Sequence, residues 1–408
     1  MEIRPILSSL RRHKTAGALI VLQVALTCAI VCNALFLITE RLDSVSLSSG
    51  IAEQELLQIR LSGLGPGDNA DARTREDLVA LRAIPGVVGV TLTNQLPFSA
   101  SSSNSGLALA PDQEHPTLNA TTYRAYDGMV ETLGIRLSAG RDFRPDEYID
   151  ITEMEAVTDY STLSSPAIIS AEVAERMFPW DSALGKTIYL GPIPLTVIGV
   201  ADTLTRPNGS NGGNMTYSFI LPLRHNYNNG GFYMLRVADP ERRGEVLEAA
   251  VAVLEKIDPN RLILNQRSYS EMREEFFSSD REMIGLLLVV CLALLAVTAF
   301  GIVGLASFWV QQRTRQIGVR RALGATKGQI LRYFQTENFL LATLGIVLGM
   351  LGAYGINQWL MATQEMARLP LYYLPVGALV LWLLGQVAVF GPARRAASVP
   401  PAIATRSA

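Results

Sequence analysis

Four long apolar segments constrain this chain of 408 residues more than any other feature of its sequence. They cover residues 16–38, 283–310, 339–360 and 371–391. Each is close to the roughly 20 apolar residues that an α-helix needs to cross a bilayer. The sequence therefore predicts four transmembrane helices. A cleaved signal peptide is the alternative for the first segment, but its apolar run is long for one and no small-residue cleavage site follows it.

The distribution of charge predicts the orientation of these helices. Residues 1–15, 311–338 and 392–408 are rich in Lys and Arg, which mark the cytoplasmic side of a membrane protein. Residues 39–282 instead contain 21 Lys and Arg against 34 Asp and Glu, a net charge of −13. We therefore expect cytoplasmic termini, a large exported domain at 39–282 and a short exported loop at 361–370.

The two ends of the exported domain have the same pattern. Each has two strand-like runs with a helix-like run between them, which is typical of a β-α-β unit with parallel strands. The sequence thus predicts an α+β domain made of two β-α-β halves. The strand-like runs are 55–61, 87–93, 232–237 and 261–266.

The middle and the end of this domain differ from its halves. Residues 95–229 are rich in short β-like runs and turn residues, which predict an inserted β-rich subdomain. Residues 270–283 are charged, have a helical pattern and contain no helix breaker before the second span. We expect a helix that continues out of the membrane as a stalk; a merely solvated start of the second span is the alternative.

The motifs of common enzymes and metal sites do not occur in the sequence. The run Leu184–Thr187 resembles the end of a phosphate-binding loop, but Trp180 stands where that loop needs a glycine. The three cysteines, Cys28, Cys32 and Cys291, lie inside apolar segments and provide no disulfide framework. We expect no catalytic residues, no metal site, no bound cofactor in this chain, and no nucleic-acid partner for so acidic a domain.

The segment between the second and third spans contains the basic run "IGVRRALGATKGQI". Its apolar residues recur at helical spacing on both sides of a Gly-Ala-Thr break, which is typical of a short amphipathic element at a membrane face. Composition alone leaves two interpretations open. The run either contacts a partner protein or serves only as a positive-inside signal.

This run resembles the coupling segment of the FtsX/MacB-type permeases of ABC transporters. Three further stretches are similar to that family and follow its order, so the resemblance covers nearly the whole chain. They are "YDGMVETLGIRLSAGRDF", "PAIISAEVAERMFPWDSALGKTIYL" and "PARRAASVPPAIATR".

The resemblance implies the function and the partners. Such a permease sits in the bacterial inner membrane, pairs with an identical or paralogous permease and works with an ABC ATPase that binds ATP and Mg. Closure of the ATPase moves the spans and the exported domains by mechanotransmission, for efflux of a substrate from the periplasm or the outer leaflet. A periplasmic adaptor and an outer-membrane channel can complete the assembly. Because the chain begins close to the first span, we expect the ATPase on a separate polypeptide.

The resemblance also assigns an ATPase-coupling element. Arg320 and Arg321 can offer planar donor forks to carboxylates, and Gly324 permits a bend. The family commonly has Glu where this chain has Gln316, which removes one charged contact. The element comprises Arg315, Gln316, Gly318, Arg320, Arg321, Ala322, Leu323, Gly324, Ala325, Thr326, Lys327 and Ile330.

Other functions remain as alternatives. A lipoprotein-release-type permease belongs to the same family, and a membrane-anchored receptor with an exported sensing domain belongs to another class. The receptor would need a cytoplasmic output module, for which the 311–338 segment is short. Within the spans, Gly345-x-x-x-Gly349 predicts close helix packing. Gln23, Asn33 and Gln386 are expected to bond between helices rather than to line a substrate path.

Overall fold

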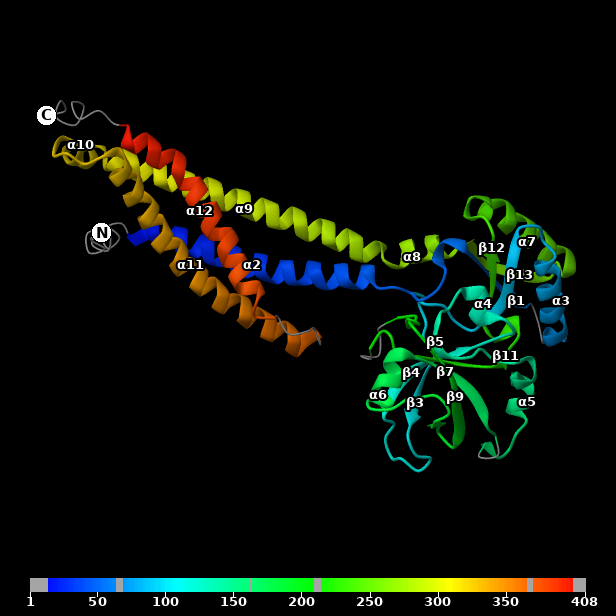
Figure 1. The fold of residues 1–408 in the computed structure, drawn as a ribbon. Helices are drawn as coiled ribbons and strands as arrows, with labels where there is room; N and C mark the ends of the chain where they lie inside the picture. The colour runs from blue at the N-terminus through cyan, green and yellow to red at the C-terminus, as the bar shows by residue number, and fades with distance from the viewer. Residues whose placement is uncertain (1–13, 64–68, 161–162, 209–213, 365–369, 399–408) are drawn as a thin grey trace. The chain divides into compact units, whose positions relative to one another are not determined.

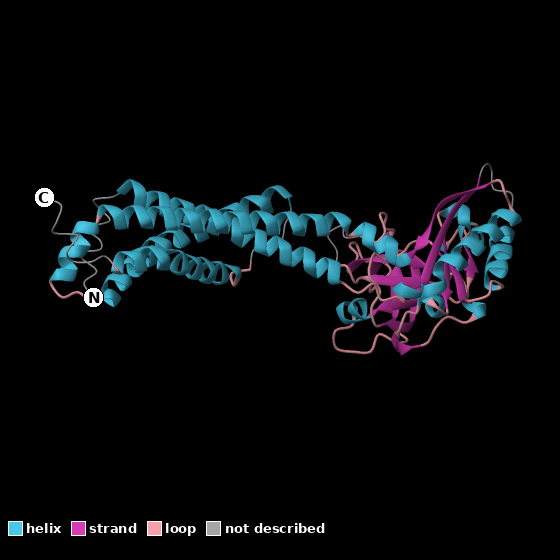
Figure 2. Ribbon diagram, turned by 90° about the horizontal axis from the view of Figure 1, so that it is seen from above, coloured by secondary structure: helices cyan, strands magenta, loops and turns pink. Residues whose placement is uncertain are grey.

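A computed structural model describes residues 14–63, 69–160, 163–208, 214–364 and 370–398. The chain divides into two compact units, a helical unit (Met1–Ser46 and Asp280–Ala408) and an α/β unit (Leu47–Ser279). The strands of the described residues all belong to the α/β unit (Figures 1 and 2). The outer parts of the predicted tails and residues 365–369 of the predicted short loop lie outside the described residues.

The helical unit contains the four helices that are long and apolar enough to cross a membrane, as predicted. They are α2 (Lys14–Ser46), α9 (Ser278–Gln312), α11 (Lys327–Gln364) and α12 (Tyr373–Ala397). The helices α2, α9 and α11 all continue beyond their apolar segments. A short helix, α10 (Thr314–Ala322), lies between α9 and α11.

Small residues of α11 pack against α2, as the Gly-x-x-x-Gly spacing predicted. A Cβ atom on Gly345 would lie 2.8 Å from the carbonyl oxygen of Val21, and one on Gly349 would lie 2.5 Å from the Cβ of Cys28. Only glycine permits this approach of two backbones. The contact joins two helices of the same chain.

The polar residues inside the spans bond between helices, as predicted. The Gln23 amide donates to the carbonyl of Val297 (3.0 Å) and the Asn33 amide to that of Ala353 (3.1 Å). The Gln386 amide donates to the carbonyl of Gln335 (3.3 Å). These bonds satisfy groups whose burial in lipid would otherwise be costly.

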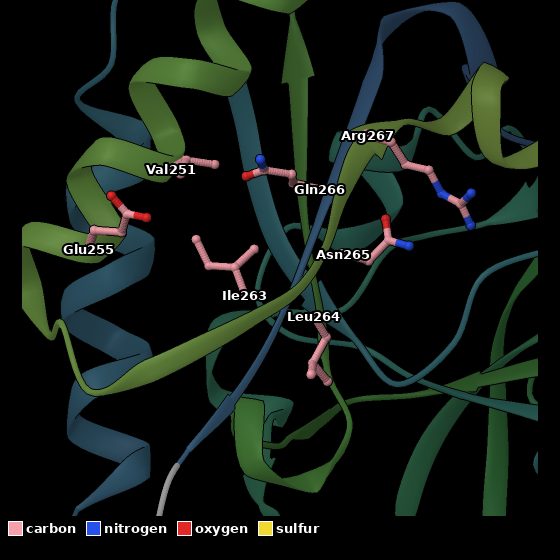
Figure 3. Close-up of a pocket in the computed structure, with 7 residues that line it drawn as sticks. All are labelled: Val251, Glu255, Ile263, Leu264, Asn265, Gln266 and Arg267. Atoms are coloured by element: carbon pink, nitrogen blue, oxygen red, sulfur yellow. The ribbon is translucent and has the colours of Figure 1, made fainter.

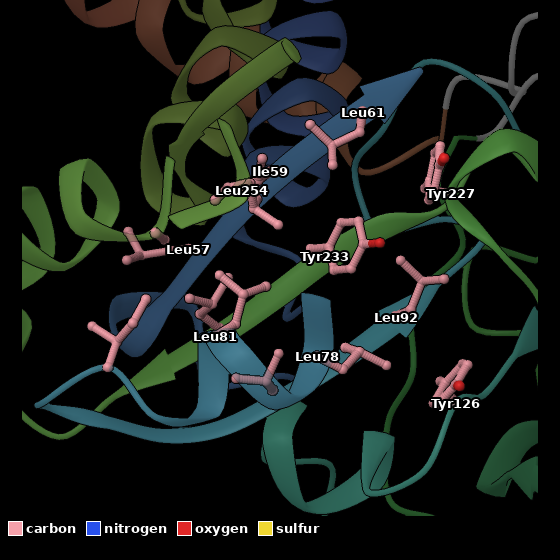
Figure 4. Close-up of a cluster of buried hydrophobic side chains, with 14 of the residues drawn as sticks. Leu57, Ile59, Leu61, Leu78, Leu81, Leu92, Tyr126, Tyr227, Tyr233 and Leu254 are labelled. Atoms are coloured by element: carbon pink, nitrogen blue, oxygen red, sulfur yellow. The ribbon is translucent and has the colours of Figure 1, made fainter. Parts of the chain in front are cut away.

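The α/β unit is built on a four-stranded sheet with the order β13-β1-β12-β2. The helices α3 (Ala70–Arg82) and α7 (Arg243–Ile257) pack on one face, where Leu57, Leu81, Tyr233 and other apolar side chains form the core (Figure 4). The strands are β1 (Leu56–Gly63), β2 (Val87–Thr93), β12 (Phe232–Val237) and β13 (Arg261–Ser268).

The two β-α-β halves are interleaved in this sheet. The strand β12 separates β1 from β2, and β1 separates β12 from β13. Every hydrogen-bonded pair in the sheet is therefore antiparallel, although the two strands of each half run parallel. The periodicity of the sequence predicts each half but carries no information about which strand pairs with which.

The β-rich insertion forms a seven-stranded sheet with the order β5-β9-β7-β10-β4-β3-β8, in which β8 also pairs with β9. Its core contains Leu107, Ile169, Val197, Phe219 and their neighbours. The strands are β3 (Asn104–Ala108), β4 (Leu118–Arg124), β5 (Leu137–Gly140), β7 (Ser165–Ser170), β8 (Thr187–Leu190), β9 (Ile193–Ala201) and β10 (Ser218–Leu221). A small pair, β6 (Ile149–Asp150) and β11 (Leu223–Arg224), and the helices α4 (Met129–Leu133), α5 (Ile151–Glu155) and α6 (Ala171–Met177) complete it.

Residues 270–283 are helical as predicted, except for a break at Phe277 that the sequence analysis did not predict. The helix α8 (Tyr269–Phe276) ends before Phe277, whose backbone is not helical, and α9 starts at Ser278. Phe277 is buried and its ring packs against those of Phe98 (5.0 Å between centroids) and Phe276 (4.9 Å). We attribute the break to this side-chain packing, which no breaker residue in the sequence signals.

Candidate coupling site between α9 and α11

The turn after α10 is a helix end that depends on glycine. The amide of Ala325 donates to the carbonyl of Arg320 (3.0 Å), and the amide of Gly324 donates to that of Arg321 (3.2 Å). This pair of bonds is the Schellman motif, which places its glycine in the left-handed region. Gly324 has a φ of 99°, a conformation that a residue with a Cβ atom adopts only under strain.

The next helix begins almost at once. The Thr326 hydroxyl accepts a hydrogen bond from the amide of Gln329 (3.2 Å), while the Gln329 side chain accepts one from the amide of Thr326 (2.9 Å). This reciprocal arrangement is a capping box, which stabilises the start of α11. The Gly-Ala-Thr break is therefore a short, fully hydrogen-bonded corner between two helices.

One face of this corner is buried within the helical unit. Ile317, Ile330 and Phe334 pack with Val310 and with small residues near the end of α12. Gly318 is also buried. Of the predicted coupling residues, Ile330 thus lies in this core and Gly318 is buried, so neither offers surface to a partner.

The opposite face of the corner is exposed and basic. Arg315, Arg320 and Lys327 are exposed, Arg321 is half-buried, and none of them forms an ion pair within the part of the chain that the structure describes. The guanidinium of Arg320 lies 5.1 Å from the centroid of the Tyr333 ring, which limits its mobility. The other exposed predicted residues are Gln316, Ala322, Leu323, Gly324 and Thr326, and Ala325 is half-buried.

Leu323 contributes an apolar tip to this face. Its side chain is 83% exposed, at the end of α10 where the chain turns. Here a large apolar side chain lies among cations that form no ion pair with described residues, and the opposite face of the corner is buried. This arrangement is typical of the centre of a protein contact surface rather than of a solvated loop.

A buried ion pair anchors the corner, and the sequence analysis missed it. Arg313, in the single-residue gap between α9 and α10, donates to both carboxylate oxygens of Glu337 on α11 (2.9 and 3.1 Å). Arg313 is 8% exposed and Glu337 is 1% exposed. The Arg313 guanidinium also lies 5.8 Å from the ring centroid of Trp309. Glu337 is the only acid in the 311–338 segment, and that isolation was the available signal.

The chain matches two family models that together cover most of its length. The MacB-like periplasmic core domain matches residues 15–253, and the FtsX-like permease C-terminal domain matches residues 288–401. The chain therefore belongs to the MacB/FtsX-type permeases of ABC transporters, as the sequence motifs indicated. It is a membrane protein with a periplasmic-type domain.

Two relatives illustrate the extent of the similarity. The chain is 24% identical over 430 residues to the uncharacterized ABC transporter permease YknZ of Bacillus subtilis (strain 168), which covers 99% of this chain and 98% of that protein. It is 27% identical over 289 residues to the macrolide export ATP-binding/permease protein MacB of Chromobacterium violaceum, which covers 68% of this chain. The match spans 44% of the length of that MacB.

Solved structures of the same kind also resemble the chain. The extracellular domain of the noncanonic ABC-type transporter YknZ from Gram-positive bacteria aligns with a TM-score of 0.32 at 16% identity, over 51% of this chain and 100% of that one. The periplasmic region of MacB from Actinobacillus actinomycetemcomitans aligns with a TM-score of 0.35 at 14% identity, over 57% of this chain and 97% of that one.

Proposed function

We propose that this chain is the permease subunit of a MacB-like ABC exporter and that the exposed face of the α10–α11 corner binds a separate ATPase subunit. The observation that carries the proposal is a set of exposed cations, Arg315, Arg320 and Lys327, that form no ion pair with any described residue and lie beside the exposed Leu323. Arg side chains in this state bind carboxylates of a partner at little cost, because no ion pair with a described residue has to be broken.

The corner is built to transmit a displacement. Its buried face is fixed to α11 and α12 by the apolar core around Ile317 and Ile330, and Arg313 connects the end of α9 to Glu337. A movement of the ATPase at this corner would therefore reach α9 and α11 as a unit. This supports mechanotransmission, in which ATP and Mg act in the partner and this chain contributes no catalytic group.

Export of a substrate from the periplasm or the outer leaflet fits the relatives. Several carry names of macrolide export proteins, and another is named a pyoverdine export ATP-binding/permease protein. The match to YknZ, named as a permease, extends over nearly the whole of both chains, which favours an ATPase on a separate polypeptide. The proposal includes a bacterial inner-membrane location, a second permease in the complex, and an adaptor with an outer-membrane channel.

Charge reversal tests the docking surface. The tagged chain is purified in mild detergent, and co-purifying proteins are identified by mass spectrometry. Arg320→Glu with Arg321→Glu should remove the ATPase from the wild-type complex, because reversed charges repel its carboxylates. Arg394→Glu with Arg395→Glu is the matched control, since these adjacent arginines are exposed near the end of α12. ATPase binding that survives the first pair, or is lost equally with both, overturns the docking assignment.

Thiol labelling tests the orientation. A cysteine at Ser101, exposed in the α/β unit, should react with an impermeant reagent in intact cells whose outer membrane is permeabilised. A cysteine at Ser398, exposed after α12, should react only after lysis. Cys28, Cys32 and Cys291 are buried and give a low background. The reverse pattern would show that the membrane orientation predicted from the charge distribution is wrong.

A further inference from the structure

A pocket of about 310 Å³ lies in the α/β unit against the four-stranded sheet. Its walls come from β1, β12 and β13, from residues 98–100 and from α8. Along β1, Leu57 and Ile59 face the core beneath α3 and α7, so Gln58 and Arg60 point to the opposite face of the sheet. The pocket volume falls at the lower end of the range for small-molecule sites, roughly 300–1,000 Å³.

The strand β13 supplies the outer wall of this pocket. Figure 3 shows Ile263 and Gln266 directed toward α7, where another pocket lies, and Asn265 and Arg267 directed away from it. The strand register agrees, because Asn265 pairs with Arg60 and Arg267 pairs with Gln58. The side chains of Asn265 and Arg267 thus lie on the face of the sheet that lines the pocket.

Two complementary polar atoms in this wall lack partners. Gln58 is 1% exposed and its Oε1 accepts no hydrogen bond within the described part of the chain. The buried Nε of Arg267, on the neighbouring strand, donates none there either. Buried polar groups are nearly always hydrogen-bonded, and each exception calls for an explanation. A ligand in this pocket that donates to the Gln58 Oε1 and accepts from the Arg267 Nε would satisfy both groups.

The remaining lining is aromatic and cationic. Phe98, Phe232 and Phe276 line the pocket, and the rings of Phe232 and Phe276 are only partly buried. The guanidinium of Arg60 lies 5.2 Å from the centroid of Phe232 and forms no ion pair with any described residue. Arg267, by contrast, is paired with Glu275. Arg60 is therefore the cation at this pocket that an anionic group could bind.

The backbone of Phe98 is strained where it enters the pocket. Its φ is 57°, in the left-handed region, where a bulky aromatic residue is a rare outlier. The ring is fully buried, packs against Phe276 (5.9 Å between centroids) and lies beneath the guanidinium of Arg273 (4.9 Å). Strained residues persist only where the surroundings hold them, and they cluster at ligand sites.

We propose that this pocket binds a small organic anion with an aromatic body. The anionic group pairs with Arg60, the aromatic body stacks on the rings of Phe232 and Phe276, and a polar substituent bonds to Gln58 and Arg267. The inference goes beyond the proposed export function and does not depend on ATPase binding. A ligand here also contacts Met272 and Phe276 of α8, directly before the helix break at Phe277.

Cysteine protection tests the site in the full-length protein. Ala100 is exposed at the pocket, so Ala100→Cys provides a reactive thiol that a bound ligand should cover. The probe is naphthionate, an aminonaphthalenesulfonate, and its matched control is naphthylamine, which lacks the anionic group. Naphthionate should slow maleimide labelling of the introduced cysteine, and naphthylamine should do so only at far higher concentration.

Variants distinguish a built site from adventitious binding. Arg60→Gln should weaken protection by naphthionate about tenfold, as expected for loss of one charge-assisted hydrogen bond, and leave naphthylamine unchanged. Phe232→Leu should weaken both probes. Arg136→Gln, which neutralises a surface arginine with 88% of its side chain exposed, should change neither. Equal protection by both probes, or protection by naphthionate that survives Arg60→Gln, overturns the proposal.

Discussion

The two compact units use their cations differently. In the α/β unit many arginines form ion pairs within the unit, such as Arg261 with Asp77 and Arg224 with Asp127. In the described part of the helical unit only Arg41 and Arg313 do so. The cations of the α10–α11 corner have no carboxylate partner there. The comparison separates arginines that stabilise the fold from arginines available to a partner.

Removing the buried acid of the helical unit should have the largest effect on stability. Glu337→Ala leaves Arg313 buried and unpaired, which should lower the free energy of unfolding by about 3–5 kcal/mol. Chemical unfolding in detergent, followed by circular dichroism, measures this. Arg315→Ala, at an exposed site that forms no ion pair with any described residue, should change it by less than about 0.5 kcal/mol. Equal effects of both substitutions would contradict the distinction between arginines that stabilise the fold and arginines available to a partner.

Acid should destabilise the α/β unit through a buried histidine. Burial lowers the pKa of His225, 1% exposed, to about 4. The unfolded chain, with a histidine pKa near 6.5, then binds more protons than the folded one between these values. The contribution of His225 should therefore lower the stability by up to about 3 kcal/mol as pH drops through this window, and this contribution should not grow further below pH 4. His225→Gln should remove this component of a pH-dependent unfolding series.

The exposed histidine of the same unit provides the control for that series. His115→Gln is the same chemical change at an exposed position, so it controls for the substitution itself. If His225→Gln leaves the slope between pH 6.5 and 4 unchanged, another group causes it.

A substitution of the glycine in the α10–α11 corner should have a moderate effect on the free energy of unfolding. Gly324→Ala places a Cβ atom at a φ of 99°, which should cost about 1–2 kcal/mol of unfolding free energy. Gly328→Ala, in α11 with no atom near the added Cβ, should be neutral or stabilising by up to about 1 kcal/mol. Thermal unfolding of both variants in one detergent gives the comparison. A Gly324→Ala variant as stable as Gly328→Ala would show that the turn tolerates other conformations.

The smallest effect is expected at a surface pair. Arg136 and Asp202 approach to 3.9 Å, but their side chains are 88% and 57% exposed. Arg136→Gln should therefore change the free energy of unfolding by less than about 0.5 kcal/mol. A larger loss would mean that exposure of an ion pair does not make it a weak contributor to the stability of this unit.

The sequence predicted features that depend on local patterns. Apolar length gave the four helices, and glycine spacing gave the contact of α11 with α2, because both are properties of one segment. The Gly-Ala-Thr break at Gly324 was visible for the same reason.

Features that depend on distant partners were not predictable. The interleaving of β1 with β12 and β13 depends on pairing between segments far apart in the chain. The Arg313–Glu337 pair needs the fold that brings α9 and α11 together, and the break at Phe277 needs the ring of Phe98. The assignment of coupling residues to an ATPase remains a prediction, although the structure buries Gly318 and places Ile330 in the apolar core.

The interleaved sheet also determines the order in which this unit can fold. Leu56 of β1 pairs with Arg236 of β12, and Leu57 pairs with Ser268 of β13, so β1 stays unpaired until the end of the unit has been synthesised. All strands of the seven-stranded sheet lie between Asn104 and Leu221, so that sheet can close first. Long-range pairing of this kind is slow and leaves strand edges open to aggregation. A newly made chain therefore needs protection for β1 during the interval before β12 and β13 arrive.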